Sequence, residues 1–222
     1  MNWPTIIMIS KNTTNKKIKA HMYWMQGWDK APPRALRNYE SWKAEGFDIT
    51  LWDDTNVPIE FHPKIPPAMR CDITLSRAQY LYGGLGLGAD MSPINADAIK
   101  NAINTLPKEK GYIVWQSIKS APANKPYNGG SYFPKGNKFI EKVWENNQKA
   151  LEVDYVDVPK PVQITGPFAW KKIFATHKQY VKIYKGSEVF LTEPRVNTIS
   201  EKAWLDAGFA GDNFGDKPEV WE

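Results

Sequence analysis

Polar and apolar residues alternate along residues 47–52, where every second side chain is apolar. This period of two is typical of a β-strand with one apolar side. In the preceding residues 34–45, the apolar side chains Leu36, Tyr39 and Trp42 recur at a spacing of three, and Gly46 follows as a helix stop. The pattern therefore predicts a helix followed directly by a strand.

The same two periods predict further elements along the chain. Apolar runs typical of strands lie at residues 18–24, 111–118, 181–184 and 189–192, and residues 2–10 are expected to form an edge strand or an arm. Apolar residues at helical spacing predict helices at 96–105, 137–151 and 168–176. Asn137 is expected to cap the second of these helices. Helices thus alternate with strands, as in an α/β domain.

Two segments show neither the helical nor the strand spacing of apolar residues, and they are expected to be irregular for most of their length. Prolines make residues 57–69 an irregular connection, because proline removes amide donors and restrains the residue before it. Residues 119–136 are rich in Pro, Gly, Asn and Lys, and they are expected to form a long surface loop with one short strand near 130–133.

Residues 71–91 combine a predicted helix, a glycine stop and a short strand that ends near an aspartate. Asp72 is expected to cap the helix, Gly83 to end it, and residues 85–87 to form the strand. Asp90 then lies near the carboxyl end of that strand, where open α/β sheets bind ligands, and its hard oxygens suit Mg or Mn carrying a phosphorylated substrate. The alternative is an ordinary turn aspartate after a glycine-rich bend.

This segment resembles the sugar-binding DXD region of GT-A glycosyltransferases, the group that includes initiating mannosyltransferases of the yeast type, capsular polysaccharide transferases and clostridial glucosylating toxins. In the pattern of that family, an SD pair is followed by a short helix, GG, an aromatic strand and DXD. Cys71 and Asp72 match the SD pair, and Gly83 and Gly84 match GG. Residues 88–90 occupy the DXD position.

The match departs from the family pattern at three positions. Gly88 replaces the first aspartate of DXD, Gly86 stands where the family has a tyrosine, and Leu75 stands where it has a helix arginine. Arg77 is a neighbouring substitute for that arginine, and the resemblance gives it contact with the diphosphate. A solvated helix arginine is the alternative.

Other landmarks of the family follow in the expected order. The segment with His21 and Trp24 resembles its opening strand, Asn56 closes the next block, and Asn128 matches an asparagine-containing strand. Thr165, Gly166 and Pro167 match a Thr-Gly-Pro turn. The segment DNFGDKPEVW, with Asn213, Asp216 and Trp221, resembles a closing segment that carries a metal ligand and a tryptophan.

The resemblance implies a role for each matched residue near the donor sugar, and most have a structural alternative. Trp24 would stack on the base or pack in the core; Asp72 would bind sugar hydroxyls while capping its helix. Asn128 would contact sugar or acceptor, or only form a turn. Thr165 and Gly166 would place amide donors near the acceptor, or only start a helix with threonine as cap.

The resemblance also implies a metal and a closing tryptophan. Asp90 would bind Mn or Mg together with Asp216 or Asn213, and Trp221 would close over the diphosphate. Disorder of the chain end is the alternative for Trp221. His21 is expected to be a hydrogen-bonded core histidine and not a ligand.

Composition and charge narrow the possible partners. The net charge of +5 favours anionic partners, but Lys and Arg are scattered, so the field is mild and a nucleotide-sugar diphosphate fits as well as nucleic acid. The resemblance implies the nucleotide sugar as the partner, and no nucleic acid is expected. The single cysteine, Cys71, excludes an intrachain disulfide, and no apolar run approaches the length of a membrane span. The N-terminus does not resemble a secretory signal, and cytoplasmic residence is the expectation.

Taken together, residues 1–222 are expected to form one GT-A domain, with a Rossmann-like mixed central sheet flanked by helices. The expected reaction moves a hexose from a nucleotide diphosphate sugar to a glycan or other hydroxyl acceptor. UDP-sugars are favoured and GDP-sugars are possible, and the resemblance implies retention of configuration with Mn or Mg assistance. The alternative is a degenerate member that binds a nucleotide sugar or glycan without turnover, motivated by Gly86 and Gly88.

Overall fold

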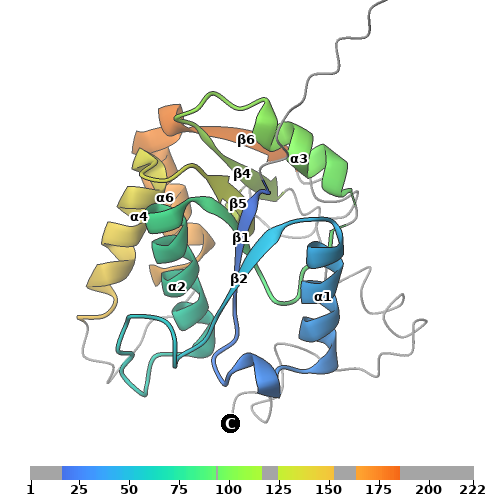
Figure 1. Cartoon of the computed structure of the whole chain (residues 1–222). Helices are drawn as coiled ribbons and strands as arrows, with labels where there is room; N and C mark the ends of the chain where they lie inside the picture. Colours follow the sequence, from blue (N-terminus) through green and yellow to red (C-terminus); the bar gives the residue numbers. More distant parts are fainter. Residues whose placement is uncertain (1–16, 94, 117–124, 153–163, 186–222) are drawn as a thin grey trace, which may run out of the picture.

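A computed structural model describes residues 17–93, 95–116, 125–152 and 164–185. Its centre is a six-stranded sheet with the order β2-β1-β3-β5-β4-β6 (Figure 1). The strands are β1 (Lys19–Tyr23), β2 (Asp48–Trp52), β3 (Gly84–Leu87), β4 (Gly111–Gln116), β5 (Lys125–Phe133) and β6 (Val181–Lys185). β1 is parallel to β2 and β3, and β4 is parallel to β6. β5 is antiparallel to β3 and β4, so the sheet is mixed, as predicted.

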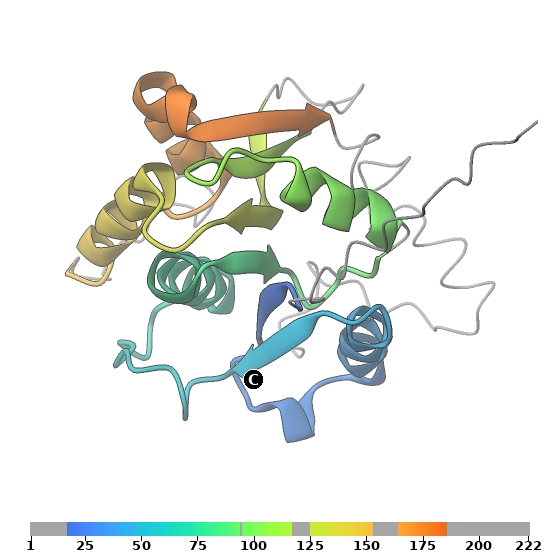
Figure 2. The ribbon, with the colours of Figure 1, turned by 45° about the horizontal axis from the view of Figure 1, so that its top comes forward.

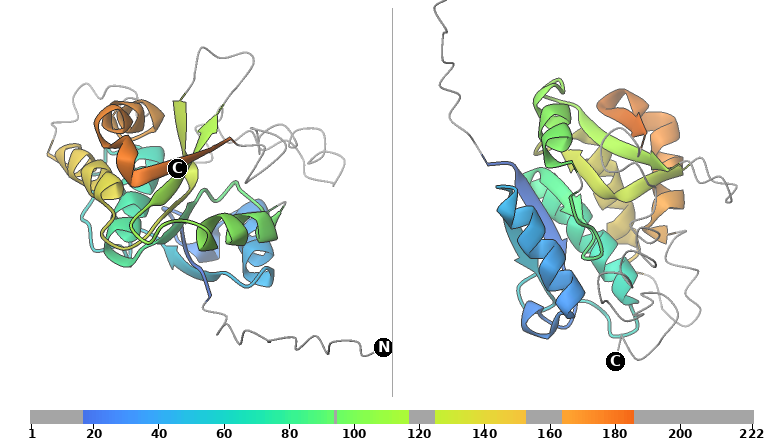
Figure 3. Two further views of the ribbon diagram at one scale, coloured as in Figure 1. Left: turned by 90° about the horizontal axis from the view of Figure 1, so that it is seen from above. Right: turned by 90° about the vertical axis from the view of Figure 1, so that its right-hand side faces the viewer.

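Helices cover both faces of the sheet. They are α1 (Pro33–Ala44), α2 (Pro67–Tyr82), α3 (Ala96–Asn104), α4 (Lys138–Lys149) and α6 (Pro167–His177), with 3-10 turns η1 (Trp28–Lys30) and η2 (Lys178–Tyr180). Figure 2 shows α1 beside β2 at one end of the sheet and α6 beside β6 at the other. Seen from above, α2, α4 and α6 gather on one side (Figure 3).

The two faces of the sheet carry separate hydrophobic clusters because the side chains of a strand alternate. In β4, Tyr112 and Val114 pack with residues of α1 and α3, whereas Ile113 packs with residues of α4 and α6. The predicted helix at 34–45 and strand at 47–52 are confirmed by α1 and β2, and Asn137 caps α4 with its side-chain oxygen, as expected.

Three local predictions are wrong. α2 begins at Pro67, because proline is well suited to the first helical turn, so Asp72 lies inside the helix and does not cap it. Residues 125–133, predicted as mostly loop, form β5, which is paired on both sides. Gly166, and not Thr165, is the residue that precedes α6 as its cap. The predicted strands at 2–10 and 189–192 lie outside the described residues.

The pair Gly83 and Gly84 joins α2 to β3 where three backbones come close together. Both have positive φ, +69° and +113°. A Cβ on Gly83 would lie 2.7 Å from the Lys135 nitrogen, and one on Gly84 would lie 2.6 Å from the Lys19 carbonyl oxygen. The two glycines therefore let β3 enter between β1 and β5.

His21 is the buried, hydrogen-bonded core histidine that was expected. Its Nε2 donates to the Gly83 carbonyl at 2.8 Å, and its Nδ1 accepts from Trp52 Nε1 at 3.3 Å. Burial lowers the pKa of the imidazole, which keeps it neutral. Within the described part of the chain, no helix combines the length and apolar character needed to cross a membrane.

Candidate functional site

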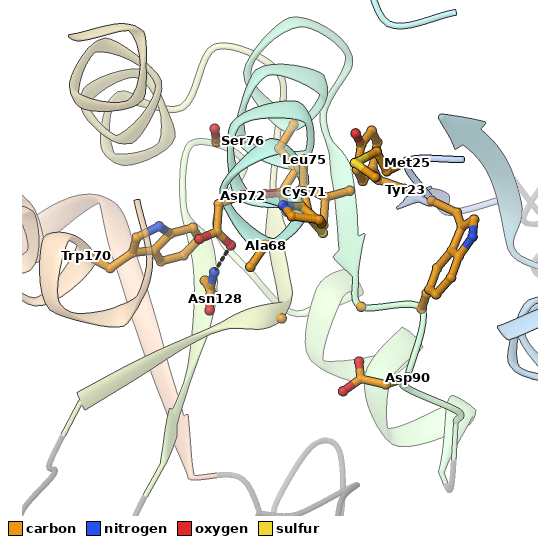
Figure 4. A pocket seen from close by; sticks show the side chains of 16 residues that line it. Tyr23, Met25, Ala68, Cys71, Asp72, Leu75, Ser76, Asp90, Asn128 and Trp170 are labelled. Atoms are coloured by element: carbon orange, nitrogen blue, oxygen red, sulfur yellow. Dashed lines mark hydrogen bonds between the residues drawn. The ribbon is translucent and has the colours of Figure 1, made fainter. Parts of the chain in front are cut away.

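A cavity of about 330 Å³ lies between α2 and the carboxyl ends of β1 and β3 (Figure 4). One wall is a face of α2 that presents Ala68, Asp72, Leu75 and Gln79, which recur at the three- and four-residue spacing of a helix. The opposite side is formed by the end of β1, the residues after β1 and β3, and the middle of β5. The sheet topology thus places the cavity at the strand ends where α/β folds bind ligands.

Asp72 holds three segments of the chain together at one end of this cavity. Asn128 Nδ2, from β5, donates to Asp72 Oδ1 at 2.5 Å. Thr165 Oγ1, just before α6, donates to Asp72 Oδ2 at 2.8 Å. Burial raises the pKa of the Asp72 carboxyl to about 7, although both hydrogen bonds act in the opposite direction. The carboxyl therefore changes its charge near neutral pH.

Asp90 faces the cavity three residues after β3. Burial raises the pKa of its carboxyl, and the positive charge of Arg34, in the first turn of α1, opposes that rise. A Cβ on Gly88 would collide with Asp90 Oδ1. The absence of a side chain at position 88 therefore leaves room for the Asp90 carboxylate in its observed position.

The glycine at position 86 also has a packing reason. The side chain of Gln79 lies against it, so a Cβ there would approach Gln79 Cδ to 2.9 Å. Gln79 Nε2 donates to the Ser131 carbonyl at 2.8 Å and to the Gly84 carbonyl at 3.3 Å, which links α2 to β5 and β3. A larger side chain at position 86 would displace this buried amide.

Tyr23, the last residue of β1, and Trp24, which follows it, form one wall of the cavity. Trp24 is 6% exposed and packs against Ala31 and Ala35 of the α1 region while it lines the cavity. The structure therefore combines the two alternatives for Trp24, a packed indole and a position at a binding cavity. The Tyr23 hydroxyl donates to Asp54, which forms an ion pair with Arg70.

Arg70 stabilises the connection between β2 and α2 through hydrogen bonds to its backbone. Its guanidinium donates to the carbonyl oxygens of Ile65 at 3.0 Å and of His62 and Pro63 at 3.2 Å, in addition to the ion pair with Asp54. One guanidinium group thus satisfies the backbone of a proline-rich segment and, through Asp54, fixes the Tyr23 hydroxyl.

Several residues that the sequence singled out do not line the cavity. Arg77 donates to the Pro58 carbonyl at 2.5 Å and lies over the Trp144 ring, away from the Asp72 face of α2. Asn56 lies in the exposed turn after β2, where its side chain bonds the backbone of Asp53 and Leu51. Gly83, Gly84 and Gly166 are also absent from the cavity lining. Asn213, Asp216 and Trp221 lie outside the described residues.

Of the two carboxylates that line the cavity, Asp90 is the candidate metal ligand, because both oxygens of Asp72 already accept hydrogen bonds from Asn128 and Thr165. Among the described residues, no group of three or more His, Cys, Asp or Glu side chains could hold an ion. None of the described residues that line the cavity carries a positive charge, while Asp72 and Asp90 are both acidic. A divalent cation held by Asp90 and by an anionic ligand fits this charge distribution.

Sequence reasoning missed other residues of the cavity. Trp170, Met25, Leu75 and Cys71 line it. Cys71 had been quoted only as a match to the SD pair, and Leu75 only as a departure from the family's helix arginine. Burial raises the pKa of the Cys71 thiol, so it stays protonated. Trp170 lies three residues after the matched Pro167, and its aromatic side chain was the available signal. Because aromatic residues mostly fill cores, that signal alone did not separate it from the other tryptophans.

Comparisons with known proteins connect this fold to glycosyltransferases. No protein-family model matches the sequence, and no curated protein matches it. The solved structure of the PaToxG glycosyltransferase is similar, with a TM-score of 0.50 and 14% identity over 71% of this chain and 68% of that one. A glycosyltransferase involved in the glycosylation of the major capsid of PBCV-1 has a TM-score of 0.50 and 12% identity, over 77% of this chain and 82% of that one. The chain therefore has the fold of these glycosyltransferases.

Proposed function

We propose that the chain is a hexosyltransferase that takes a sugar from a nucleotide diphosphate donor, preferably a UDP-sugar, to a glycan or other hydroxyl acceptor. The observation that carries the proposal is the meeting of Asp72 and Asn128 in the same cavity as Asp90, with Asp72 held by a further bond from Thr165, which is buried and does not line the cavity. Carboxylate and amide groups are suited to sugar hydroxyls, and the second carboxylate is suited to a metal-bound diphosphate. The glycosyltransferase fold supports this assignment.

The chain's own residues would divide the donor between the two ends of the cavity. Asp72 and Asn128 would hold the transferred hexose, Trp24 would support the base, and Asp90 would lie at the diphosphate between them. Asn128, fixed by its bond to Asp72, would orient the sugar toward the acceptor. Retention of configuration is part of the proposal, as implied by the family resemblance.

Mn or Mg is proposed as the cofactor because the cavity has acidic groups on both sides. Arg34 acts on Asp90 but does not line the cavity, so a diphosphate brought beside Asp90 and ionised Asp72 would still be repelled without a further positive charge. Asp90 would hold the ion, and residues 213 and 216 stay proposed ligands. When bound, the ion would supply the charge that neutralises the departing diphosphate.

A thermal-shift panel of UDP- and GDP-sugars, with and without Mn, tests this function. We expect a metal-dependent rise in melting temperature with at least one donor, followed by slow release of free nucleotide. Asp72→Ala should abolish the rise, whereas Asp97→Asn, at a fully solvated position on α3, should preserve it. Absence of any shift and of any nucleotide release across the panel would refute the proposal.

A degenerate protein of this fold is the second candidate, and glycine at positions 86 and 88 favours it. The two candidates differ in turnover and not in binding. A donor that raises the melting temperature but is never hydrolysed or transferred, even with an excess of glycan acceptors, would favour the degenerate protein.

A further inference from the structure

Trp170 closes the end of the cavity at which Asp72 lies. Its indole approaches from α6 and lies beside the Asp72 carboxylate, opposite the wall formed by Tyr23 and Met25 (Figure 4). The turn before α6 is tied to the same carboxylate through Thr165. Asp72 and Trp170 therefore form one corner, with a hydrogen-bonding group and a flat apolar wall next to each other.

The indole is held in place by two other rings. Trp170 is 3% exposed, and its ring centroid lies 5.6 Å from that of Phe139 and 5.9 Å from that of Phe133. These two phenyl rings are themselves stacked at 5.7 Å. Close packing on the side away from the cavity leaves the indole no space into which it could withdraw when a ligand enters.

We propose that Trp170 is a specificity-determining residue that limits the donor to an unsubstituted hexose and excludes an N-acetylhexosamine. This inference rests on the proposed function. A hexose presents only hydroxyl groups to the corner, and Asp72 and Asn128 can bond these. An acetamido group in the same place would meet a rigid apolar wall, which offers no partner for its amide and no room for its methyl group.

The cavity volume agrees with a compact ligand. At about 330 Å³ the cavity is near the lower end of the range for small-molecule sites, roughly 300–1,000 Å³. Replacing Trp170 by a smaller residue would extend the cavity directly beyond Asp72, whereas truncating a residue of the α4–α6 cluster that neither lines the cavity nor makes a ring contact with the indole would not. Val143 offers the matched control, because it is fully buried in the same cluster and does not line the cavity.

The experiment compares UDP-glucose with UDP-N-acetylglucosamine, and GDP-mannose as a third donor, by nucleotide release under the same conditions. We expect wild type to prefer the unsubstituted hexoses by at least about tenfold in kcat/KM. Trp170→Leu should reduce that preference by about tenfold or more, and Val143→Ala should retain it. Trp170→Phe provides a milder enlargement should the leucine variant not fold.

Two results would overturn the inference. One is a wild type that uses both UDP-sugars equally, and the other is a folded Trp170 variant that keeps the full preference. If no donor is turned over, the proposed function fails, and the corner is tested alone by ligand-observed NMR with free glucose, mannose and N-acetylglucosamine. Binding of glucose and mannose but not of N-acetylglucosamine, with this selectivity reduced in the Trp170 variant, would then support the proposed role of Trp170. Equal contact, or contact with none of the three sugars, would refute it.

Discussion

Asn128 and Asp72 are joined by a hydrogen bond of 2.5 Å between the amide Nδ2 and the carboxylate Oδ1, across 56 positions of the sequence. With the bond from Thr165 to the other oxygen, a single carboxyl group ties β5 and the start of α6 to the middle of α2. The geometry of the cavity therefore depends on the ionisation and the partners of one buried side chain.

The first prediction concerns pH. Burial raises the pKa of the Asp72 carboxyl from an ordinary value of 3.8 to about 7, so the folded protein binds this proton more tightly than the unfolded chain. The contribution of Asp72 to stability is complete below about pH 4 and is lost as the pH rises through about 7. Denaturant unfolding between pH 5 and 8 should show a steeper fall for wild type than for Asp72→Asn. Parallel curves for the two proteins would contradict the assignment.

The second prediction concerns the partner of that carboxyl. Asn128→Ala removes one of its two donors, so the free energy of unfolding at pH 8 should fall by about 1–3 kcal/mol. At pH 5, where the carboxyl is protonated, the loss should be smaller. Asn101→Ala, on an exposed position of α3, is the control and should change stability little at either pH. An equal loss for Asn128→Ala at both pH values would show that the bond is not charge-assisted.

The third prediction separates two glycines with positive φ. Gly84 has φ +113° and a Cβ there would lie 2.6 Å from the Lys19 carbonyl, whereas Gly46 has φ +84° and open space around it. Gly84→Ala should therefore cost more than about 2 kcal/mol of stability, because conformational strain adds to a backbone collision. Gly46→Ala should cost about 1 kcal/mol from conformation alone. Equal midpoints of urea unfolding for the two variants would contradict this prediction, and would mean that β1 can move away from β3 to make room for the added methyl group.

The fourth prediction concerns Arg70. Its side chain is 11% exposed and supports both Asp54 and the connection before α2, so Arg70→Leu leaves a carboxylate without its cation and should cost about 3 kcal/mol. Arg70→Leu with Asp54→Asn should recover part of this loss, because the uncompensated charge is gone. Additive losses in denaturant unfolding would show that the ion pair contributes no coupling.

Much of the fold follows from local pattern, and its exceptions have physical causes. α1, β2 and α4 were predictable because their periodicity is regular and because Gly46 after α1 and the cap Asn137 before α4 mark helix ends. β5 was not, because its Gly and Asn residues are held by backbone pairing to β3 and β4 on both sides and not by apolar alternation. α2 began five residues before the predicted cap, since the prolines of the preceding connection hid its first turn.

The site was predictable only in part, because its contacts join segments that lie far apart in the sequence. The sequence placed Asp90 beyond β3, and the structure brings Asp72, Asn128 and Thr165 together. Thr165 was assigned a local cap, because a sequence does not display a bond across 93 positions. Arg77 lies five residues after Asp72, which on a helix is about 140° away around the axis. Its absence from the cavity thus follows from a helix that extends through both residues.

The last prediction concerns the carboxylate proposed to hold the metal. Gly88 has no side chain, and a Cβ added there would collide with Asp90 Oδ1, so Gly88→Ala must displace the carboxylate from its place at the cavity. The change lies within the loop after β3, and the added methyl group can be accommodated by rotation of the Asp90 side chain. We therefore expect the free energy of unfolding to change by less than about 1 kcal/mol.

Donor binding in the presence of Mn, measured by calorimetry, should weaken by about tenfold in the Gly88→Ala protein, and Asp90→Asn should weaken it at least as much. Binding without metal should be equal in wild type and both variants. A Gly88→Ala protein that keeps full Mn-dependent affinity would separate Asp90 from the metal and would leave the neutralisation of the diphosphate to another group.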